Sequence, residues 1–285
     1  SPDLIITDLT MPGIDGLETL IEIGRLNAEI TRIMLTGYAT MASAIDAVNE
    51  GIDGFLTKPF QNDELRAKVR EFNIKKKLKQ FIPEQVLKEL QRSGTMLLPK
   101  SLQVTILFTD IRGFTSLSQR LAPAELSELL NRHYFNPVDN IIFSHNGTLD
   151  KHIGDSIMGI FGAPVGSEDA AYRALEAALA IRDEMLVINK GISEEGKKIA
   201  IGIGIATGDV MAGIFGSTRK KEYTVLGSPV NLASRLENLA QANEILICSE
   251  TARLVEDRMN LEKVPSPIIR GLDKPPDLFR VLGKK

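Results

Sequence analysis

Several polar residues in this chain lie at the ends of predicted strands, where they could bind a cation that carries phosphate. Residues 104–108 are mostly apolar and β-favouring, so they predict a buried strand that brings Asp110 to its carboxyl end. Gly113 then allows a tight turn before Phe114, and the backbone amides of such a turn can bend around an anion. A carboxylate in this setting suits a divalent cation with a polyphosphate. Alternatively, Asp110 only caps the helix expected from residue 115 or 116.

A second carboxylate lies in the stretch 147–161, which predicts two short strands around a turn at Gly154 and Asp155. A Gly-Asp pair between β-favouring runs is a hairpin signal, so Asp155 is expected at the hairpin tip. Two carboxylates on separate strand ends are the minimum ligand set for a two-metal phosphoryl-transfer centre. Asp110 and Asp155 therefore predict a site for phosphoryl transfer.

A third stretch predicts a strand that carries Thr224, followed by a helix with Ser228 as its N-cap and Pro229 as its first residue. Asn231 and Arg235 are four residues apart on that helix and therefore share one face. An arginine on an exposed helix face is usually only a solvated charge. Together with an amide one turn earlier and a nearby hydroxyl, it can also hold a phosphate group.

These residues belong to one continuous domain that we expect from residue 102 onward. Its interleaved strands and helices predict an α+β fold with a sheet and helices on one face. A second Gly-Asp pair, Gly208 and Asp209, predicts another hairpin turn. The expected helices are 123–142 and 168–189, and the expected strands beyond those already described are 198–206, 210–215, 222–226, 245–248, 261–264 and 278–282.

The first 61 residues show a different pattern, in which strands at 3–8, 32–36 and 54–60 alternate with helices at 17–26 and 41–49. This is the βα pattern of a parallel sheet, whose ligands bind at the carboxyl ends of the strands. The strand ends carry Asp8, Thr36 and Lys58, which we expect to converge on one edge. A helix at 62–79, the segment 81–90 and a linker at 94–100 follow.

Composition excludes several classes of function. The 285 residues suffice for two domains, and a net charge of −3 argues against an electrostatic nucleic-acid binder. No run approaches the roughly 18 apolar residues that a spanning helix needs, so we expect no membrane segment in these residues. The single cysteine, Cys248, allows no intrachain disulfide and fits the reducing cytoplasm.

The three stretches that carry these polar residues resemble the signature of class III nucleotidyl cyclases, and the resemblance covers residues 102–282. It implies a ferredoxin-like α+β catalytic domain with a mixed sheet, and two divalent cations, Mg²⁺ or Mn²⁺. At Arg270 the family usually has a lysine for the triphosphate, so this chain departs from the pattern there. The implied metal ligands are Asp110, Asp155 and the Ile111 carbonyl; the implied substrate contacts are Lys151, Thr224, Arg270, Gly113 and Phe114; Asn231 is implied to orient the ribose and Arg235 to stabilise transition-state charge.

Lys151 and Thr224 correspond to the family's purine-selecting pair and favour adenine. A lysine can donate a hydrogen bond to adenine N1, and a threonine hydroxyl can accept one from the N6 amino group. Guanylyl members of the family carry Glu and Cys at these two places, and this chain has neither. The resemblance thus implies that the chain converts ATP to cyclic AMP and pyrophosphate. The alternative for Lys151 is a cross-hairpin salt bridge with Asp155.

The N-terminal stretch resembles the last three βα units of a response-regulator receiver domain, an α/β flavodoxin-like fold. The matching residues are Asp8 as phospho-acceptor, Thr36 as phosphoryl-sensing hydroxyl, Lys58 as phosphate contact and Phe55 as switch aromatic, with a commonly cis Lys58–Pro59 bond. No strand with an acidic pair for Mg²⁺ precedes Asp8 in this chain, so we expect a truncated receiver that is not phosphorylated in this form. The alternative is a half-sheet used for packing or dimerisation.

We therefore divide the chain into a partial receiver at 1–61, a linker helix and connecting segment at 62–100, and a cyclase catalytic domain at 101–285. The resemblance further implies a homodimer with shared active sites, and a histidine kinase as a partner through the receiver. A module that binds nucleotide or a partner without turnover is the competing hypothesis. A diguanylate cyclase is excluded, because its Gly-Gly-acidic-acidic-Phe motif is absent from the sequence.

Overall fold

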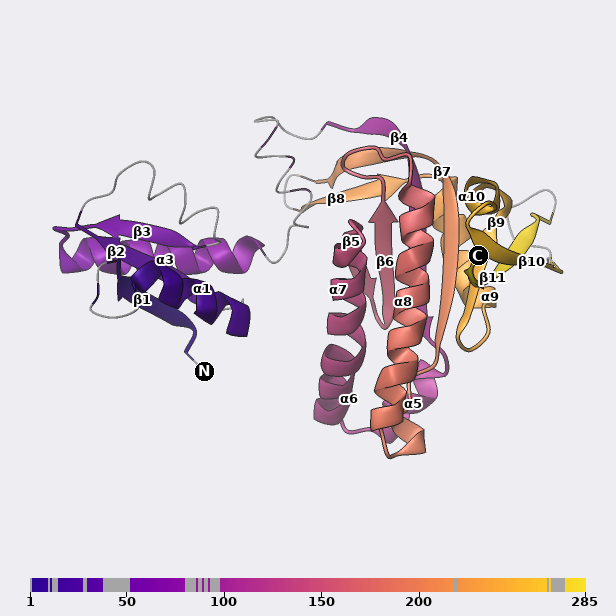
Figure 1. Ribbon diagram of the computed structural model, residues 1–285, viewed down its shortest axis with the longest axis horizontal. Coiled ribbons are helices and arrows are strands. Elements are labelled where there is room, and N and C mark those ends of the chain that lie inside the picture. The colour runs from indigo at the N-terminus through magenta and orange to yellow at the C-terminus, as the bar shows by residue number, and fades with distance from the viewer. Residues whose placement is uncertain are drawn as a thin grey trace. The chain divides into compact units, whose positions relative to one another are not determined.

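The computed structural model describes residues 2–9, 11, 15–27, 30–37, 52–79, 86, 89, 92, 98–217, 220–265, 267 and 275–285. The chain forms two compact units, Ser1–Ile82 and Pro83–Lys285. Each unit has its own sheet (Figure 1). Each unit also has hydrophobic core residues of its own.

The N-terminal unit contains the parallel sheet that the sequence predicts. The strands β1 (Leu4–Asp8), β2 (Thr31–Thr36) and β3 (Gly54–Thr57) pair in parallel in that order. Helix α1 (Gly16–Leu26) begins at an Asp15 cap, and its buried Leu20 packs with Met34 and Ile52. The predicted helix at 41–49 lies outside the described residues.

Helix α3 (Asn62–Lys79) has the predicted bounds, but it packs on this sheet and is not a free-standing linker. The Lys76 ammonium lies 2.8 Å from Asp53, and the Thr31 hydroxyl lies 3.4 Å from the Asn73 side chain. The compact N-terminal unit therefore extends beyond residue 61, the predicted end of the receiver. Most of the predicted segment 81–90 and linker 94–100 lies outside the described residues.

The C-terminal unit is built on an eight-stranded mixed sheet, in the order β10-β11-β9-β7-β4-β6-β5, with β8 paired to β7. Parallel pairing occurs between β7 and β9, and the other pairs are antiparallel. The strands are β4 (Lys100–Ile111), β5 (Thr148–Ile153), β6 (Ser156–Phe161), β7 (Ile201–Gly216), β8 (Lys221–Leu226), β9 (Glu244–Cys248), β10 (Met259–Val264) and β11 (Leu278–Lys284).

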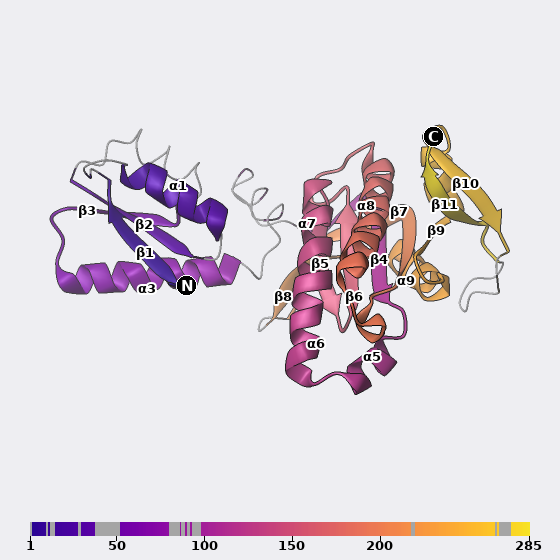
Figure 2. The ribbon, with the colours of Figure 1, turned by 60° about the horizontal axis from the view of Figure 1, so that its bottom comes forward.

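Helices cover both faces of this sheet, and not only one face as predicted. Alternate residues of β4 face opposite ways, so Leu107 joins the core under α7 and α8, while Ile106 joins the core under α9. Figure 2 shows the long helix α8 on one side of the central strands and α9 on the other. In the described ranges, no helix combines the length and the apolar character that crossing a membrane requires. The helices are α5 (Phe114–Arg120), α6 (Pro123–Leu130), a π-helical turn (Asn131–Phe135), α7 (Asn136–Ser144), α8 (Ala170–Gly191), a 3₁₀ turn (Glu195–Lys197), α9 (Ser228–Leu239) and α10 (Ser249–Val255).

The predicted hairpin at Gly208 and Asp209 is wrong, because β7 runs straight through both residues. Gly208 pairs with Val104 and Asp209 with Gln103 in an unbroken ladder with β4. A Cβ atom on Gly208 would lie 2.8 Å from Pro229 Cγ. This glycine is therefore required for the close approach of the first turn of α9, and the turn to β8 comes later, after Gly216 with φ +128°.

Candidate active site

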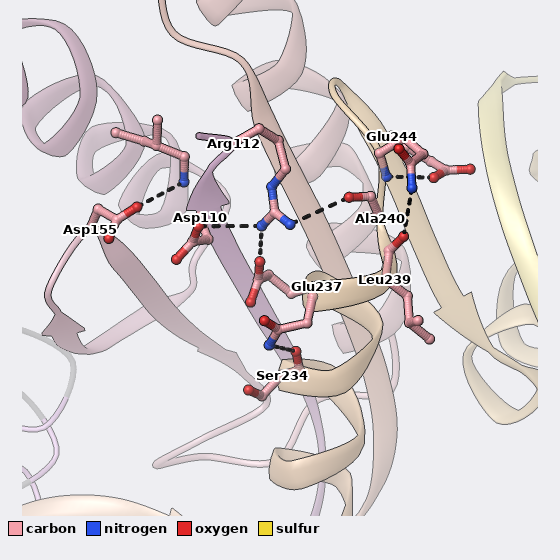
Figure 3. Close-up of polar contacts among 11 residues, drawn as sticks. Asp110, Arg112, Asp155, Ser234, Glu237, Leu239, Ala240 and Glu244 are labelled. Atoms are coloured by element: carbon pink, nitrogen blue, oxygen red, sulfur yellow. Dashed lines mark hydrogen bonds and ion pairs between the residues drawn. The ribbon is translucent and has the colours of Figure 1, made fainter. Parts of the chain in front are cut away.

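Asp110 and Asp155 lie side by side, as the sequence predicts. Asp110 is near the carboxyl end of β4, and Asp155 is at the tip of the hairpin between β5 and β6. β6 pairs with β4 up to the Thr109–Ile157 position, which brings the tip beside Asp110. The Asp155 carboxylate accepts a hydrogen bond of 3.3 Å from the Ile111 amide (Figure 3).

The electrostatics of this pair favour a bound cation. Burial and the neighbouring Asp155 charge raise the pKa of Asp110 to about 6, and Arg112 only partly opposes this rise. A divalent ion between the two carboxylates would remove their repulsion. No group of three or more acidic, histidine or cysteine side chains in the described ranges could hold a metal. The pair therefore fits a metal whose remaining ligands are backbone, water or phosphate oxygens.

The alternative that Asp110 merely caps the next helix is excluded. Helix α5 begins after Gly113, which has φ +73° and serves as its N-cap without any side-chain hydrogen bond. The Gly113 carbonyl accepts from the amides of Ser116 and Leu117 at 3.0 and 3.1 Å. Phe114 is partly buried against the core. The Asp110 carboxylate therefore does not cap α5, and its charged neighbours are Arg112 and Asp155.

The predicted purine pair, Lys151 on β5 and Thr224 on β8, converges on a third residue, Asp150. The Thr224 hydroxyl donates to Asp150 at 3.1 Å, and the Lys151 ammonium lies 3.5 Å from the same carboxylate oxygen. Lys151 also forms an ion pair of 2.8 Å with Glu222, so the alternative pairing with Asp155 is wrong. Burial lowers the pKa of Lys151, but its contacts with Glu222 and Asp150 outweigh that effect and raise it.

Asp150 was not predicted as a site residue from the sequence. In the structure its side chain is fully buried. Burial raises its pKa, while Lys151 and the Thr224 hydroxyl oppose the rise. The register of β5 and β6 shifts between Leu149 and Lys151, so Asp150 is an extra, bulged residue. Two consecutive charged residues in a strand break the usual alternation of apolar and polar residues, and this was the one available signal.

Asn231 and Arg235 lie one turn apart on α9, as predicted. Within the part of the chain that the structure describes, neither side chain forms a hydrogen bond or ion pair. The N-cap of α9 is Gly227 and not the predicted Ser228, which is the first helical residue. The helix packs directly on β7, because a Cβ on Gly204 would lie 2.0 Å from the backbone nitrogen of Glu237.

An ionic contact that sequence reasoning missed joins the carboxylate pair to α9. Arg112 forms an ion pair with Glu237 and lies 3.4 Å from Asp110 (Figure 3). Its guanidinium also donates to the Ala240 carbonyl at the end of α9, at 3.4 Å. Arg112 and Glu237 are 125 residues apart, and nothing in either local sequence indicates the contact.

In the N-terminal unit, the predicted Asp8 and Lys58 form an ion pair, and Thr36 is buried at the end of the neighbouring strand. The Lys58–Pro59 peptide bond is cis, as the resemblance to receiver domains implies. Phe55 packs against the small core of this unit. Arg270, predicted to contact the triphosphate, lies outside the described residues.

Comparisons with known families agree with this geometry. The profile of the adenylate and guanylate cyclase catalytic domain matches residues 98–277, and that of the response regulator receiver domain matches residues 1–70. An adenylate cyclase of Anabaena cylindrica is 37% identical over 179 residues, which are 60% of this chain and 33% of that protein. This chain spans about a third of the length of the curated relatives that it matches.

Solved structures resemble the C-terminal unit. The crystal structure of the adenylyl cyclase CyaB from P. aeruginosa is 35% identical with a TM-score of 0.62, and the match covers 66% of this chain and 98% of that one. The guanylate cyclase domain of RhGC from Catenaria anguillulae, in complex with GTP, is 28% identical with a TM-score of 0.59, covering 65% and 100%. Relatives of both base specificities therefore share this fold.

Proposed function

Because this chain belongs to the family of adenylate and guanylate cyclase catalytic domains, we propose that it converts ATP to 3′,5′-cyclic AMP and pyrophosphate. The observation that carries the choice of ATP is the convergence of Lys151 and Thr224 on one buried carboxylate. The two side chains come from different strands, β5 and β8, and together they offer one donor and one hydroxyl to a purine edge.

This pair matches adenine better than guanine. The Lys151 ammonium has only donors, so it suits the N1 acceptor of adenine and opposes the N1–H of guanine. Lys151 keeps about a third of its side chain exposed, 31%, which leaves it accessible to a ligand. In the bound state, adenine N1 would accept the hydrogen bond that Lys151 now donates to Glu222.

The reacting end of the nucleotide would lie at Asp110 and Asp155. Mg²⁺ or Mn²⁺ ions held by these carboxylates and by the Ile111 carbonyl would neutralise the triphosphate and lower the pKa of the ribose 3′-hydroxyl. Asn231 would orient the ribose, and Arg235 would stabilise the charge that develops at the α-phosphate. Arg270, Gly113 and Phe114 would contact the remaining substrate groups; of these, Gly113 offers an exposed backbone turn.

We propose that the active unit is a head-to-tail homodimer. Lys151 and Asp155 are only four residues apart on one hairpin, yet Lys151 would hold the purine and Asp155 a metal at the far end of the nucleotide. At about 3.3 Å per strand residue, one hairpin would have to span both ends of a single ATP. A two-fold axis removes the conflict, because each site takes Asp110 and Asp155 from one copy and Lys151, Thr224, Asn231 and Arg235 from the other.

We further propose that the receiver unit supplies a signal input. The ion pair between Asp8 and Lys58 supports this, because it leaves a carboxylate and a cation together at the carboxyl end of a parallel sheet. In a receiver with its acidic Mg²⁺ pair, Asp8 would be the phospho-acceptor, with Thr36 as the sensing hydroxyl and a histidine kinase as the phosphate source.

The direct test is product formation from ATP or GTP in the presence of Mn²⁺, with cyclic nucleotide and pyrophosphate measured separately. We expect cyclic AMP and pyrophosphate in equal amounts, and a higher kcat/KM for ATP than for GTP. The competing hypothesis, a module that binds nucleotide without turnover, predicts saturable ATP binding and no product. Asp110→Asn serves as the control, because it should abolish product and leave the fold intact.

A further inference from the structure

The Thr224 hydroxyl alone cannot distinguish adenine from guanine. A hydroxyl can donate one hydrogen bond and accept others, so by itself it can face either the 6-amino group of adenine or the 6-oxo group of guanine. Discrimination requires that something fix the direction of the hydroxyl hydrogen. The inference below rests on the proposed function and concerns this direction.

The structure provides a fixed acceptor for that hydrogen. The Thr224 hydroxyl donates to Asp150 at 3.1 Å, and both groups are buried: Thr224 is 6% exposed and the Asp150 side chain is not exposed at all. The Lys151 ammonium at 3.5 Å favours the ionised form of Asp150. An ionised carboxylate has only acceptors, so the hydrogen bond then runs from Thr224 to Asp150. The other carboxylate oxygen of Asp150 is buried and has no hydrogen-bond partner among the described residues.

The bulge in β5 explains how Asp150 reaches this position. Adjacent strand residues normally point to opposite faces of a sheet. Here Asp150 contacts Thr224, and Lys151 contacts Glu222, two residues earlier on the same face of β8. The extra residue in β5 therefore directs both consecutive side chains toward β8.

We propose that Asp150 is a specificity-determining positioning residue, which holds the Thr224 hydroxyl as a pure acceptor toward the purine 6-position. With its hydrogen directed to Asp150, the Thr224 oxygen presents only lone pairs. It then accepts from the 6-amino group of adenine and repels a 6-oxo group. Asp150 also lies 3.5 Å from Lys151, but the Lys151 ammonium has a shorter ion pair, 2.8 Å, with Glu222, so the proposed effect of Asp150 acts through Thr224.

The test compares kcat/KM for ATP with that for ITP, which carries the 6-oxo group without the 2-amino group of guanine. In Asp150→Ala the Thr224 hydroxyl can rotate and donate, so we expect the ATP-to-ITP ratio to fall at least tenfold. Asp150→Asn keeps one acceptor oxygen but adds a donor, and should lower the ratio at least threefold. The matched control is Asp139→Ala, which removes a carboxylate bonded to His152 of the same hairpin at 3.0 Å and should leave the ratio unchanged.

A double-mutant cycle separates orientation of the hydroxyl from a general structural effect. In a Thr224→Val background there is no hydroxyl to orient, so Asp150→Ala should change the ratio by less than twofold. In a Thr224→Ser background the hydroxyl remains, and the tenfold loss should persist. An unchanged ratio in Asp150→Ala, or an equal loss in the valine background, overturns the proposal. Circular dichroism checks the fold, and if Asp150→Ala does not fold, the Asp150→Asn ratio decides.

The outcome remains decisive if the wild-type chain proves not to turn over nucleotide. Dissociation constants of ATP and ITP, measured by calorimetry with Ca²⁺, give the same ratio without catalysis. A wild type that binds ATP without forming product contradicts the proposed function, and its binding ratios still test Asp150. A wild type without preference for ATP over ITP contradicts the Asp150 proposal, even when cyclic nucleotide is formed.

Discussion

The Arg112 guanidinium lies between Asp110 of β4 and Glu237 of α9, and it forms ion pairs with both. Asp110 would bind metal, whereas α9 carries Asn231 and Arg235. In a head-to-tail dimer these two groups of one chain would serve different sites. Arg112 thus connects, within one chain, a residue of one proposed half-site to the helix that carries the other.

Replacement of Arg112 by alanine should destabilise the C-terminal unit. The Glu237 carboxylate, with only 5% of its side chain exposed, would lose its counter-charge. Leaving a buried charge unpaired costs about 3 kcal/mol of unfolding free energy. Urea unfolding of Arg112→Ala measures this loss. The control is Arg253→Ala, which removes an exposed ion pair to Glu250 and should cause no resolvable change. Equal stabilities of the two variants would contradict a bracing role for Arg112.

Metal affinity should fall in acid because of Asp110. Its pKa is raised from 3.8 to about 6, so between these pH values Asp110 is protonated in the folded protein and ionised in the unfolded chain. Protonated Asp110 therefore contributes to the unfolding free energy below pH 3.8, and this contribution is lost as the pH rises through about 6. A proton on Asp110 also competes with Mn²⁺, so the Mn²⁺ dissociation constant should be about tenfold higher at pH 5.0 than at pH 7.5.

Calorimetric titration of Mn²⁺ at these two pH values measures the effect. Asp110→Asn should bind Mn²⁺ weakly at both values and lose the pH dependence that Asp110 contributes. A wild-type affinity that stays constant between pH 5.0 and 7.5 would show that Asp110 is not a ligand.

Features that depend on local sequence patterns could be predicted from the sequence. Turn residues and helix and strand periodicity predict the β5–β6 hairpin and the parallel strands of the N-terminal unit. They also predict that Asn231 and Arg235 share one face of α9. The continuity of β7 could not be predicted, because Gly208 serves the packing of Pro229 and not a turn. Likewise, the contacts of Asp150 and Arg112 depend on partners 74 and 125 residues away.

The close packing of α9 on β7 gives a further prediction. A Cβ at Gly204 would lie 2.0 Å from the Glu237 nitrogen and 2.3 Å from the Ala233 carbonyl oxygen, so α9 would have to move as a whole. Gly204→Ala should lower the unfolding free energy by about 3 kcal/mol. Gly283→Ala is the matched control, since a Cβ there meets nothing within 4 Å and should change stability by less than about 0.5 kcal/mol. Denaturant unfolding that finds Gly204→Ala as stable as Gly283→Ala would refute this packing.

The shared active site is tested most directly by mixing two inactive variants. Asp110→Ala should lack a metal ligand and Arg235→Ala the transition-state cation, so each alone should produce almost no cyclic AMP. In an equal mixture about half of the dimers are heterodimers, and one of the two sites in each combines both intact residue sets. We therefore predict recovery to about a quarter of wild-type activity, rising with protein concentration until dimerisation saturates. A mixture that stays inactive, although tagged heterodimers are isolated from it, would contradict the account.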